Sequence, residues 1–198
     1  MRNLLLAMGA TVALAACGGG TTVAPMARYD LGGAGGKGGA QQTVPLAGVE
    51  VQSASWLGGS DMHYRLSFAE PQQRRSYVES RWVAPPGELL ESALRRRLSS
   101  SQGGSGCRLQ VALDEFEHRF DDTRSSAAVI ELRAALAAPR GGEILLRRSL
   151  MVKQVAATAD ARGGAGAARE AAARLGDELE SWLADASRDR SLVDRCRS

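Results

Sequence analysis

The residues that carry most enzyme chemistry are scarce in this sequence. Its 198 residues include two histidines and three cysteines, and the GxSxG motif that marks a serine nucleophile does not occur. Glu115 and His118 have the ExxH spacing that brings two metal ligands together on a helix. The segment around them instead continues a strand pattern, in which residues three apart point to opposite faces. We therefore expect no catalytic residues, no metal ion and no cofactor.

Lysine is nearly absent: Lys37 and Lys153 are the only two, and all other basic residues are arginines. Aromatic residues make up 5% of the chain, and the net charge is +3, with the basic residues spread along the sequence. Proteins that bind nucleic acid combine a basic patch with a recognition motif or stacking aromatics, and this sequence has no such combination. Nucleic acid is therefore excluded as a partner.

Glycine, in contrast, is abundant, with 23 residues, and it is concentrated in a low-complexity loop at 32–40. Within this loop, Gly33, Gly35 and Gly38 match the GxGxxG spacing of dinucleotide sites. That fingerprint requires a helix directly afterwards, whose N-terminus receives the pyrophosphate. The residues that follow, up to Pro45, do not predict such a helix, so we attribute the match to chance.

Only one long hydrophobic run is present, the uncharged stretch 4–16 that follows the basic start of the chain. It is shorter than a membrane-spanning helix and rich in alanine. A basic start, a short apolar run and small residues before the cut are typical of a secretory signal, here residues 1–16. The lipobox of bacterial lipoproteins, whose cysteine thiol accepts diacylglycerol, is matched by Leu14-Ala15-Ala16-Cys17. We identify Cys17 as the lipid-attachment residue, in preference to an ordinary cysteine in a cleaved leader.

The anchor determines where we expect the protein to act. Acyl chains such as palmitate on Cys17 contribute about 0.8 kcal/mol per buried methylene, so several chains on one residue hold the protein at a membrane. Gly18 follows the lipidated cysteine, at a position where aspartate is the usual signal for retention in the inner membrane. We therefore expect the protein on the periplasmic face of the outer membrane, with residues 17–27 as a lipidated tether.

Two cysteines remain after lipid attachment, Cys107 and Cys196. Exported proteins meet oxidising conditions, in which an even number of cysteines favours pairing. A bridge between these two closes a loop of about 90 residues, for which the chain-entropy model gives about 4–5 kcal/mol of stabilisation. We therefore expect a disulfide, with two unrelated thiols as the alternative.

Hydrophobic periodicity predicts a domain of strands and two helices. Alternating apolar residues predict strands near 29–31, 49–52, 62–68, 76–83, 109–113, 130–136 and 144–152. Helical periodicity begins at Pro85-Pro86 and again at Asp160. These elements predict an α+β fold with two helices packed on a mainly antiparallel, or mixed, sheet of five to seven strands. We assign a single domain to 28–190 and a polar tail to 191–198.

The three tryptophans, Trp56, Trp82 and Trp182, are candidates for a hydrophobic ligand pocket or for core packing. Trp182 lies on the apolar face of the second predicted helix, where core packing is favoured. Trp56 precedes a glycine turn and is the best candidate for a contact surface, with cover of a sheet edge as the alternative.

The order of several short motifs is distinctive. They are Trp56-Leu57, Asp61-Met62, Tyr64-Arg65 and Arg81-Trp82-Val83-Ala84-Pro85-Pro86, supported by Tyr29-Asp30-Leu31, a long strand from Cys107 to Phe120 and a closing helix with Trp182. Together they resemble the ABC-type transport auxiliary lipoproteins, a PqiC-like family. The resemblance extends over nearly all of the chain after Cys17, and its most specific part is the Tyr-Arg and Arg-Trp pairing ahead of a proline-initiated helix.

The resemblance implies a transport accessory in the envelope of a Gram-negative bacterium, beside an ABC transporter or a mammalian-cell-entry (MCE) type protein. The implied role is to assist phospholipid movement between the two membranes, and so to support membrane integrity. The family supplies no catalytic residues, and the loop 32–40 departs from the compact loop usual in it. A single small domain offers too little interior for a whole phospholipid. We therefore expect a homo-oligomer, or docking onto the transporter partner, through the surface around Trp56.

Two other functions stay open from the sequence alone. A free-standing lipoprotein would hold a hydrophobic ligand in a pocket of its own, and a structural lipoprotein would act in assembly of the outer membrane. A deep apolar cavity between sheet and helices would favour the first of these, and a filled core would count against it.

Overall fold

The computed structural model describes three stretches of the chain, residues 25–32, 44–98 and 106–197. The expected signal peptide 1–16, the lipid-attachment residue Cys17 and nearly all of the glycine-rich loop 32–40 lie outside the described residues.

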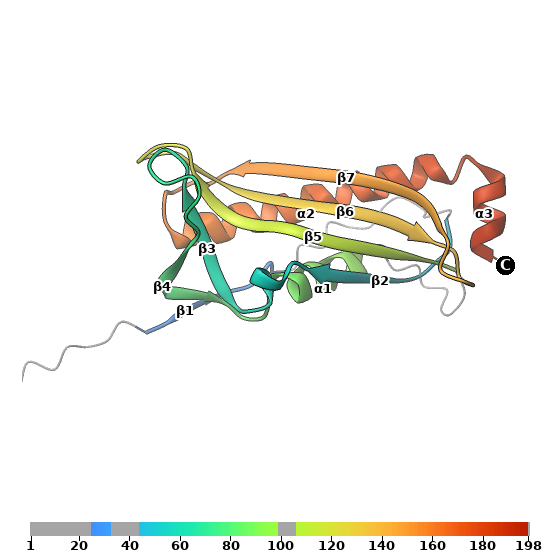
Figure 1. Ribbon diagram of the computed structural model, residues 1–198, viewed down its shortest axis with the longest axis horizontal. Helices are drawn as coiled ribbons and strands as arrows, with labels where there is room; N and C mark the ends of the chain where they lie inside the picture. The colour runs from blue at the N-terminus through green and yellow to red at the C-terminus, as the bar shows by residue number, and fades with distance from the viewer. Residues whose placement is uncertain (1–24, 33–43, 99–105, 198) are drawn as a thin grey trace, which may run out of the picture.

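Seven strands and three α-helices are formed by the described residues (Figure 1). The strands are β1 (Ala27–Tyr29), β2 (Leu46–Ser53), β3 (Asp61–Leu66), β4 (Arg75–Trp82), β5 (Cys107–Phe120), β6 (Ser126–Ala137) and β7 (Ile144–Val155). The helices are α1 (Pro86–Leu98), α2 (Ala161–Ala186) and α3 (Arg190–Arg197), and a short 3₁₀ turn, η1 (Ser55–Leu57), follows β2. The strand pattern predicted for 62–68 ends early, because β3 stops at Leu66 and Phe68 lies exposed in the turn that follows.

All seven strands belong to one sheet, in the order β1-β4-β3-β5-β6-β7, with β2 also paired to β5. One edge of β5 pairs antiparallel with β6 along almost its whole length. Its other edge is shared: β2 runs parallel to the first half of β5, and β3 runs parallel to its last three residues. Three of the six strand pairs are parallel and three are antiparallel. The predicted α+β fold with a single sheet is confirmed, and the sheet is mixed.

Both long helices lie on one face of this sheet. α1 packs on β2, and α2 packs on β6 and β7, where Figure 1 shows it running behind the strands. The core between the sheet and these two helices is apolar. Alternate residues of β5, among them Leu109, Val111 and Leu113, point into it and belong to one buried cluster with leucines of α1 and alanines of α2. Small alanine side chains let α2 lie close to the strands. The opposite face of the sheet carries no helix among the described residues.

The expected polar tail 191–198 is wrong as a description of this segment. Residues 190–197 form α3, which packs against β5 and buries Leu192, Val193 and Cys196. An isolated helix this short is unstable in water, so its packing must hold it in place. The few apolar residues among arginines and aspartates concealed this from the sequence pattern.

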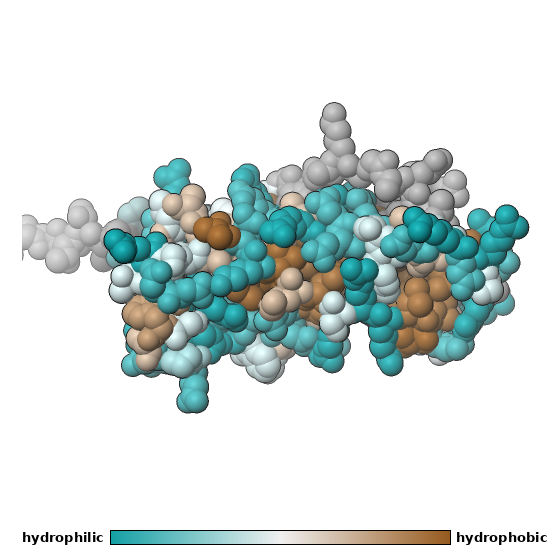
Figure 2. Space-filling model, turned by 90° about the horizontal axis from the view of Figure 1, so that it is seen from above, coloured by the Kyte–Doolittle hydropathy of each residue, from teal (hydrophilic) through white to brown (hydrophobic). Residues whose placement is uncertain are grey.

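Surface hydrophobic side chains are divided into separate patches. Figure 2, which views the molecule from the side where β7 lies at the top of Figure 1, shows these patches between hydrophilic side chains. Met151 and Val155 on the outer strand β7 are among the exposed large hydrophobic residues. Among the described residues, none of the helices combines the length and the apolar character needed to span a membrane.

Candidate functional site

Trp56 is held at the surface by the residues on both sides of it. It lies in η1, where its neighbour Leu57 is fully buried while the tryptophan itself is 54% exposed. The carbonyl oxygen of Trp56 accepts a hydrogen bond from Nε2 of His63 at 3.2 Å. The guanidinium carbon of Arg74 lies 5.7 Å from the centre of the indole ring, within the range of a cation–π contact. The indole is therefore exposed and has a defined position.

A network of charged side chains joins this tryptophan to the central strand. Arg74 donates two hydrogen bonds of 2.7 Å to the two carboxylate oxygens of Glu115, which raises the pKa of Arg74 above its usual value. Two residues further along β5, Glu117 accepts from Nε of Arg65 at 3.0 Å and from Nε of Arg119 at 2.9 Å. The side chain of Glu117 is completely buried. Each carboxylate is paired by arginine, so the network fixes Arg74 beneath the ring of Trp56.

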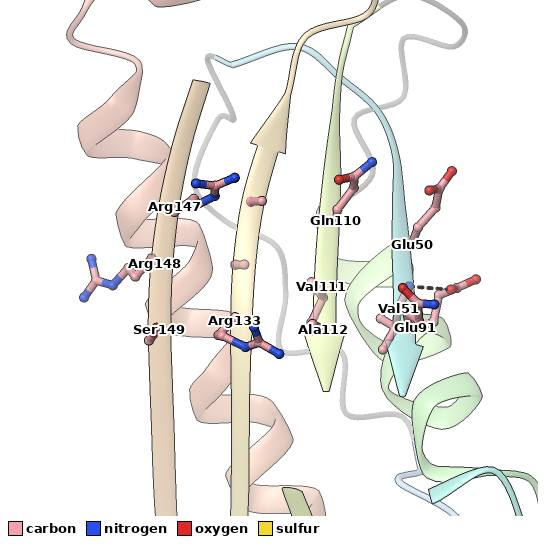
Figure 3. A pocket seen from close by; sticks show the side chains of 13 residues that line it. Glu50, Val51, Glu91, Gln110, Val111, Ala112, Arg133, Arg147, Arg148 and Ser149 are labelled. Carbon is pink, nitrogen blue, oxygen red and sulfur yellow. Dashed lines mark hydrogen bonds between the residues drawn. The ribbon is translucent and has the colours of Figure 1, made fainter. Parts of the chain in front are cut away.

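The uncovered face of the sheet contains a groove of about 540 Å³, lined by β2, β5, β6 and β7 with Glu91 of α1 at one side (Figure 3). Directly paired residues share a face of a sheet. The pairs Gln110↔Ala135↔Arg147 and Ala112↔Arg133↔Ser149 therefore form two rows across this groove. The alanines make its floor, and longer polar side chains stand around them. Arg133 donates to both carboxylate oxygens of Asp114, at 2.8 and 2.7 Å.

His118 lies on the opposite, helix-facing side of β5 and is buried. Its Nδ1 is hydrogen-bonded to the hydroxyl of Tyr77 at 2.8 Å, and its Nε2 has no partner among the described residues. Burial lowers the pKa of His118 to about 4, so the ring is uncharged near neutral pH. The cavity beside it, between the sheet and α2, has a volume of about 10 Å³, which is at most the space of one water molecule.

The structure joins Cys107, the first residue of β5, to Cys196 of α3 in a disulfide, the pairing that the sequence favours. Both cysteines are fully buried. Trp56 lies elsewhere: β2 begins opposite Cys107 and ends opposite Leu113, and η1 follows it. Cys107 and Leu113 are six residue steps apart along β5, so the disulfide and Trp56 are separated by about 20 Å. Trp82 and Trp182 are buried in the core, where Trp82 meets Phe116 edge to face.

Glu115 and His118 point to opposite faces of β5, as their spacing on a strand predicts: one joins the arginine network and the other faces α2. Within the described residues, no group of three or more histidine, cysteine and carboxylate side chains could hold a metal ion. Sequence reasoning missed the arginine network and the groove. Alternation along β6 and β7 places Arg133 and Arg147 on outward faces, but only the register of the two strands brings these residues to one groove.

Comparison of the sequence with protein-family models finds no match, and neither does comparison with curated proteins. Comparison with solved structures shows the fold. Protein XCC0632 from Xanthomonas campestris, described as DUF330, superposes with a TM-score of 0.65 at 20% identity, covering 84% of this chain and 91% of its own. A second structure, of an uncharacterized protein, has a TM-score of 0.61 at 16% identity and covers 80% of this chain and 99% of its own. The chain is thus similar in fold, over most of its length, to a DUF330 protein.

Proposed function

We propose that this protein is a non-enzymatic lipoprotein subunit of an ABC- or MCE-type envelope transport system that assists phospholipid movement between the membranes. In this proposal, lipid on Cys17 anchors it to the outer membrane, and the folded domain faces the periplasm. The lipobox, the family resemblance of the sequence motifs and the similarity of fold to XCC0632 support it.

The observation that carries the docking part of the proposal is the exposed indole of Trp56. Tryptophan is among the residues most enriched at the energetic centres of protein interfaces. An anchor residue binds better when its position is fixed beforehand, because less side-chain freedom is lost on association. Arg74 provides that support here, because its guanidinium carbon lies 5.7 Å from the centre of the indole ring. Glu115 in turn holds Arg74 through a hydrogen bond of 2.7 Å. This favours a partner surface that covers Trp56.

The alternative, a lipoprotein that binds a hydrophobic ligand in its interior, receives less support. Leucines, alanines and two tryptophans fill the space between the sheet and the helices. The cavity beside His118, at about 10 Å³, is far below the roughly 300–1,000 Å³ of ordinary ligand pockets. Transport by docking needs no such pocket in this domain.

The anchor is tested by fractionating cells that express the full chain or its Cys17→Ser variant. We expect the native chain in the outer membrane with the porins, and an unlipidated product from the variant. Recovery of the native chain chiefly with inner-membrane markers would contradict the assignment that rests on Gly18.

Docking is tested by placing a photo-crosslinking amino acid at position 56 in the full chain, with position 155 as the matched control. Val155 is an exposed hydrophobic residue on the edge strand β7, with β5 and β6 between it and β3. We expect position 56, and not 155, to crosslink to an MCE-type or permease protein encoded beside this gene. Trp56→Ala should weaken that complex by roughly thirtyfold, the equivalent of about 2 kcal/mol, without lowering the melting temperature. A substitution that changes only stability would reject Trp56 as the anchor.

A further inference from the structure

The groove on the uncovered face of the sheet concentrates hydrogen-bond donors on one of its walls. Arg147 on β7 is paired in register with Ala135 on β6, and Arg133 lies two residues further along β6. Diagonal neighbours on adjacent strands are about 7–8 Å apart, within reach of long side chains. Figure 3 shows the guanidinium of Arg147 directed toward β6 and that of Arg133 toward β5, with Gln110 on the far side of the alanine floor.

The two arginines differ in how far their charge is already compensated. Arg133 uses Nε and one terminal nitrogen on Asp114, which leaves its other terminal nitrogen for a ligand. Arg147 makes no ion pair or side-chain hydrogen bond with the described residues of the chain. An arginine that lines a groove without a carboxylate partner retains its full donor capacity for an anion.

We propose that this groove binds a phosphate group, held between Arg147 and Arg133 above Ala135. Two guanidinium groups, the Gln110 amide and the Ser149 hydroxyl offer more donors than a carboxylate can accept, whereas the oxygens of a phosphate can use them. Glu50 lies on the opposite, β2 wall, so the anion belongs on the β6–β7 side. This site goes beyond the proposed function, since docking through Trp56 does not require it.

The small side chain of Ala135 is essential to this arrangement. Strand pairing places Ala135 directly between Gln110 and Arg147 in one row across the sheet. Because its side chain is a single methyl group, the space between the two longer side chains stays open. A larger residue at this position would fill the site without changing any charge. Ala135→Leu is therefore a variant that separates loss of the site from loss of positive charge.

Arg148 supplies a matched control for Arg147. It is the next residue on the same exposed strand and carries the same charge, but its side chain points away from the groove in Figure 3. The full chain, purified in a non-ionic detergent, is titrated with inorganic phosphate and, separately, with a short-chain phosphatidylglycerol, and binding is followed by phosphorus NMR. Thermal unfolding of every variant checks that the fold is intact.

We expect Arg147→Gln and Ala135→Leu each to weaken binding about tenfold or more, and Arg148→Gln to leave it within about twofold. Binding of both probes with this dependence identifies the site as one for the phosphate itself. Binding of the phosphatidylglycerol alone with this dependence identifies a lipid headgroup as the source. Equal losses in the Arg147 and Arg148 variants would show a nonspecific charge effect and overturn the site, as would no binding of either probe at millimolar concentration.

Discussion

The backbone of Gly164, in the first turn of α2, packs directly against the imidazole of His118 on β5. A Cβ atom at position 164 would lie 2.5 Å from Nδ1 of that ring, a distance that packed atoms do not adopt. Both residues are buried, and the Tyr77 hydroxyl is hydrogen-bonded to the same Nδ1 atom at 2.8 Å, which fixes the ring in place. The glycine therefore sets how closely the start of α2 approaches the sheet.

Gly164→Ala should destabilise the fold, because either the helix or the histidine must move to admit the methyl group. Overpacking of this kind costs about 1–3 kcal/mol. Gly166→Ala is the matched control: it lies two residues further along α2, where an added Cβ meets nothing within 4 Å. There alanine should stabilise the helix by up to about 1 kcal/mol. Urea unfolding of both variants measures the difference, and equal effects would show that the contact with His118 does not limit the packing.

Stability should fall as the solution is acidified from about pH 6.5 toward pH 4, because His118 is buried uncharged. Its pKa is about 4 in the folded chain, against the ordinary value of 6.5. The unfolded chain binds a proton in this interval and the folded chain does not, so falling pH favours unfolding. Above about pH 6.5 the free energy of unfolding no longer depends on His118. By pH 4 we expect that free energy to have fallen by an amount on the order of 3 kcal/mol.

Urea unfolding of the native chain and of His118→Gln between pH 4 and 8 tests this pH dependence. The variant is expected to be less stable at pH 8 but to lose less stability on acidification. Asp160, at the start of α2, also faces this region, and its pKa is lowered chiefly by the Gly163 backbone N–H. Its carboxylate therefore titrates below the interval used here. Parallel pH profiles for the two proteins would contradict the role of His118.

A partly buried arginine joins the two long helices. Arg97 in the last turn of α1 donates to Glu180 of α2 at 2.9 Å and is also paired with Asp177, and its side chain is 6% exposed. Removing one partner of a fully buried pair costs about 3–5 kcal/mol, because the other charge is left uncompensated. Here Asp177 is 64% exposed and Glu180 is 12% exposed, so we expect Arg97→Met to cost less, about 1–3 kcal/mol in chemical unfolding. Arg96→Met, on the neighbouring exposed position, should change stability by less than about 0.5 kcal/mol.

The double variant Arg97→Met/Glu180→Met tests why Arg97 matters. Either the ion pair stabilises the fold on balance, or Arg97 only compensates the negative charge of Glu180. We expect it to be more stable than Arg97→Met alone, because the buried carboxylate is removed with its partner. A double variant that is less stable than either single change would show that the effects come from lost packing.

Particular residues show what the sequence could and could not predict. Leu109, Val111 and Leu113 alternate strictly, and Pro86 begins a helix with an apolar face, so the sheet and α1 follow from local pattern. α3 has too few apolar residues for a clear period. The groove depends on which strands are neighbours and on their register, since Arg133 and Arg147 meet only through the β6–β7 pairing. Contacts of this kind are long-range and leave no local signal.

The remaining prediction concerns the disulfide, which holds α3 to the first residue of β5. Cys107 and Cys196 are 89 residues apart, so their cross-link removes much of the freedom of the unfolded chain. The chain-entropy model gives about 4–5 kcal/mol for such a loop. In the double variant Cys107→Ser/Cys196→Ser we expect a loss of this order in chemical unfolding, and faster amide hydrogen exchange in α3 than in α2, because a helix of eight residues has little stability of its own. Reductant should lower the stability of the native chain and leave that of the variant unchanged. Mass spectrometry of the purified protein, kept from reductant, should find it two hydrogens lighter than the dithiol form, and free thiols on both cysteines would contradict the bridge.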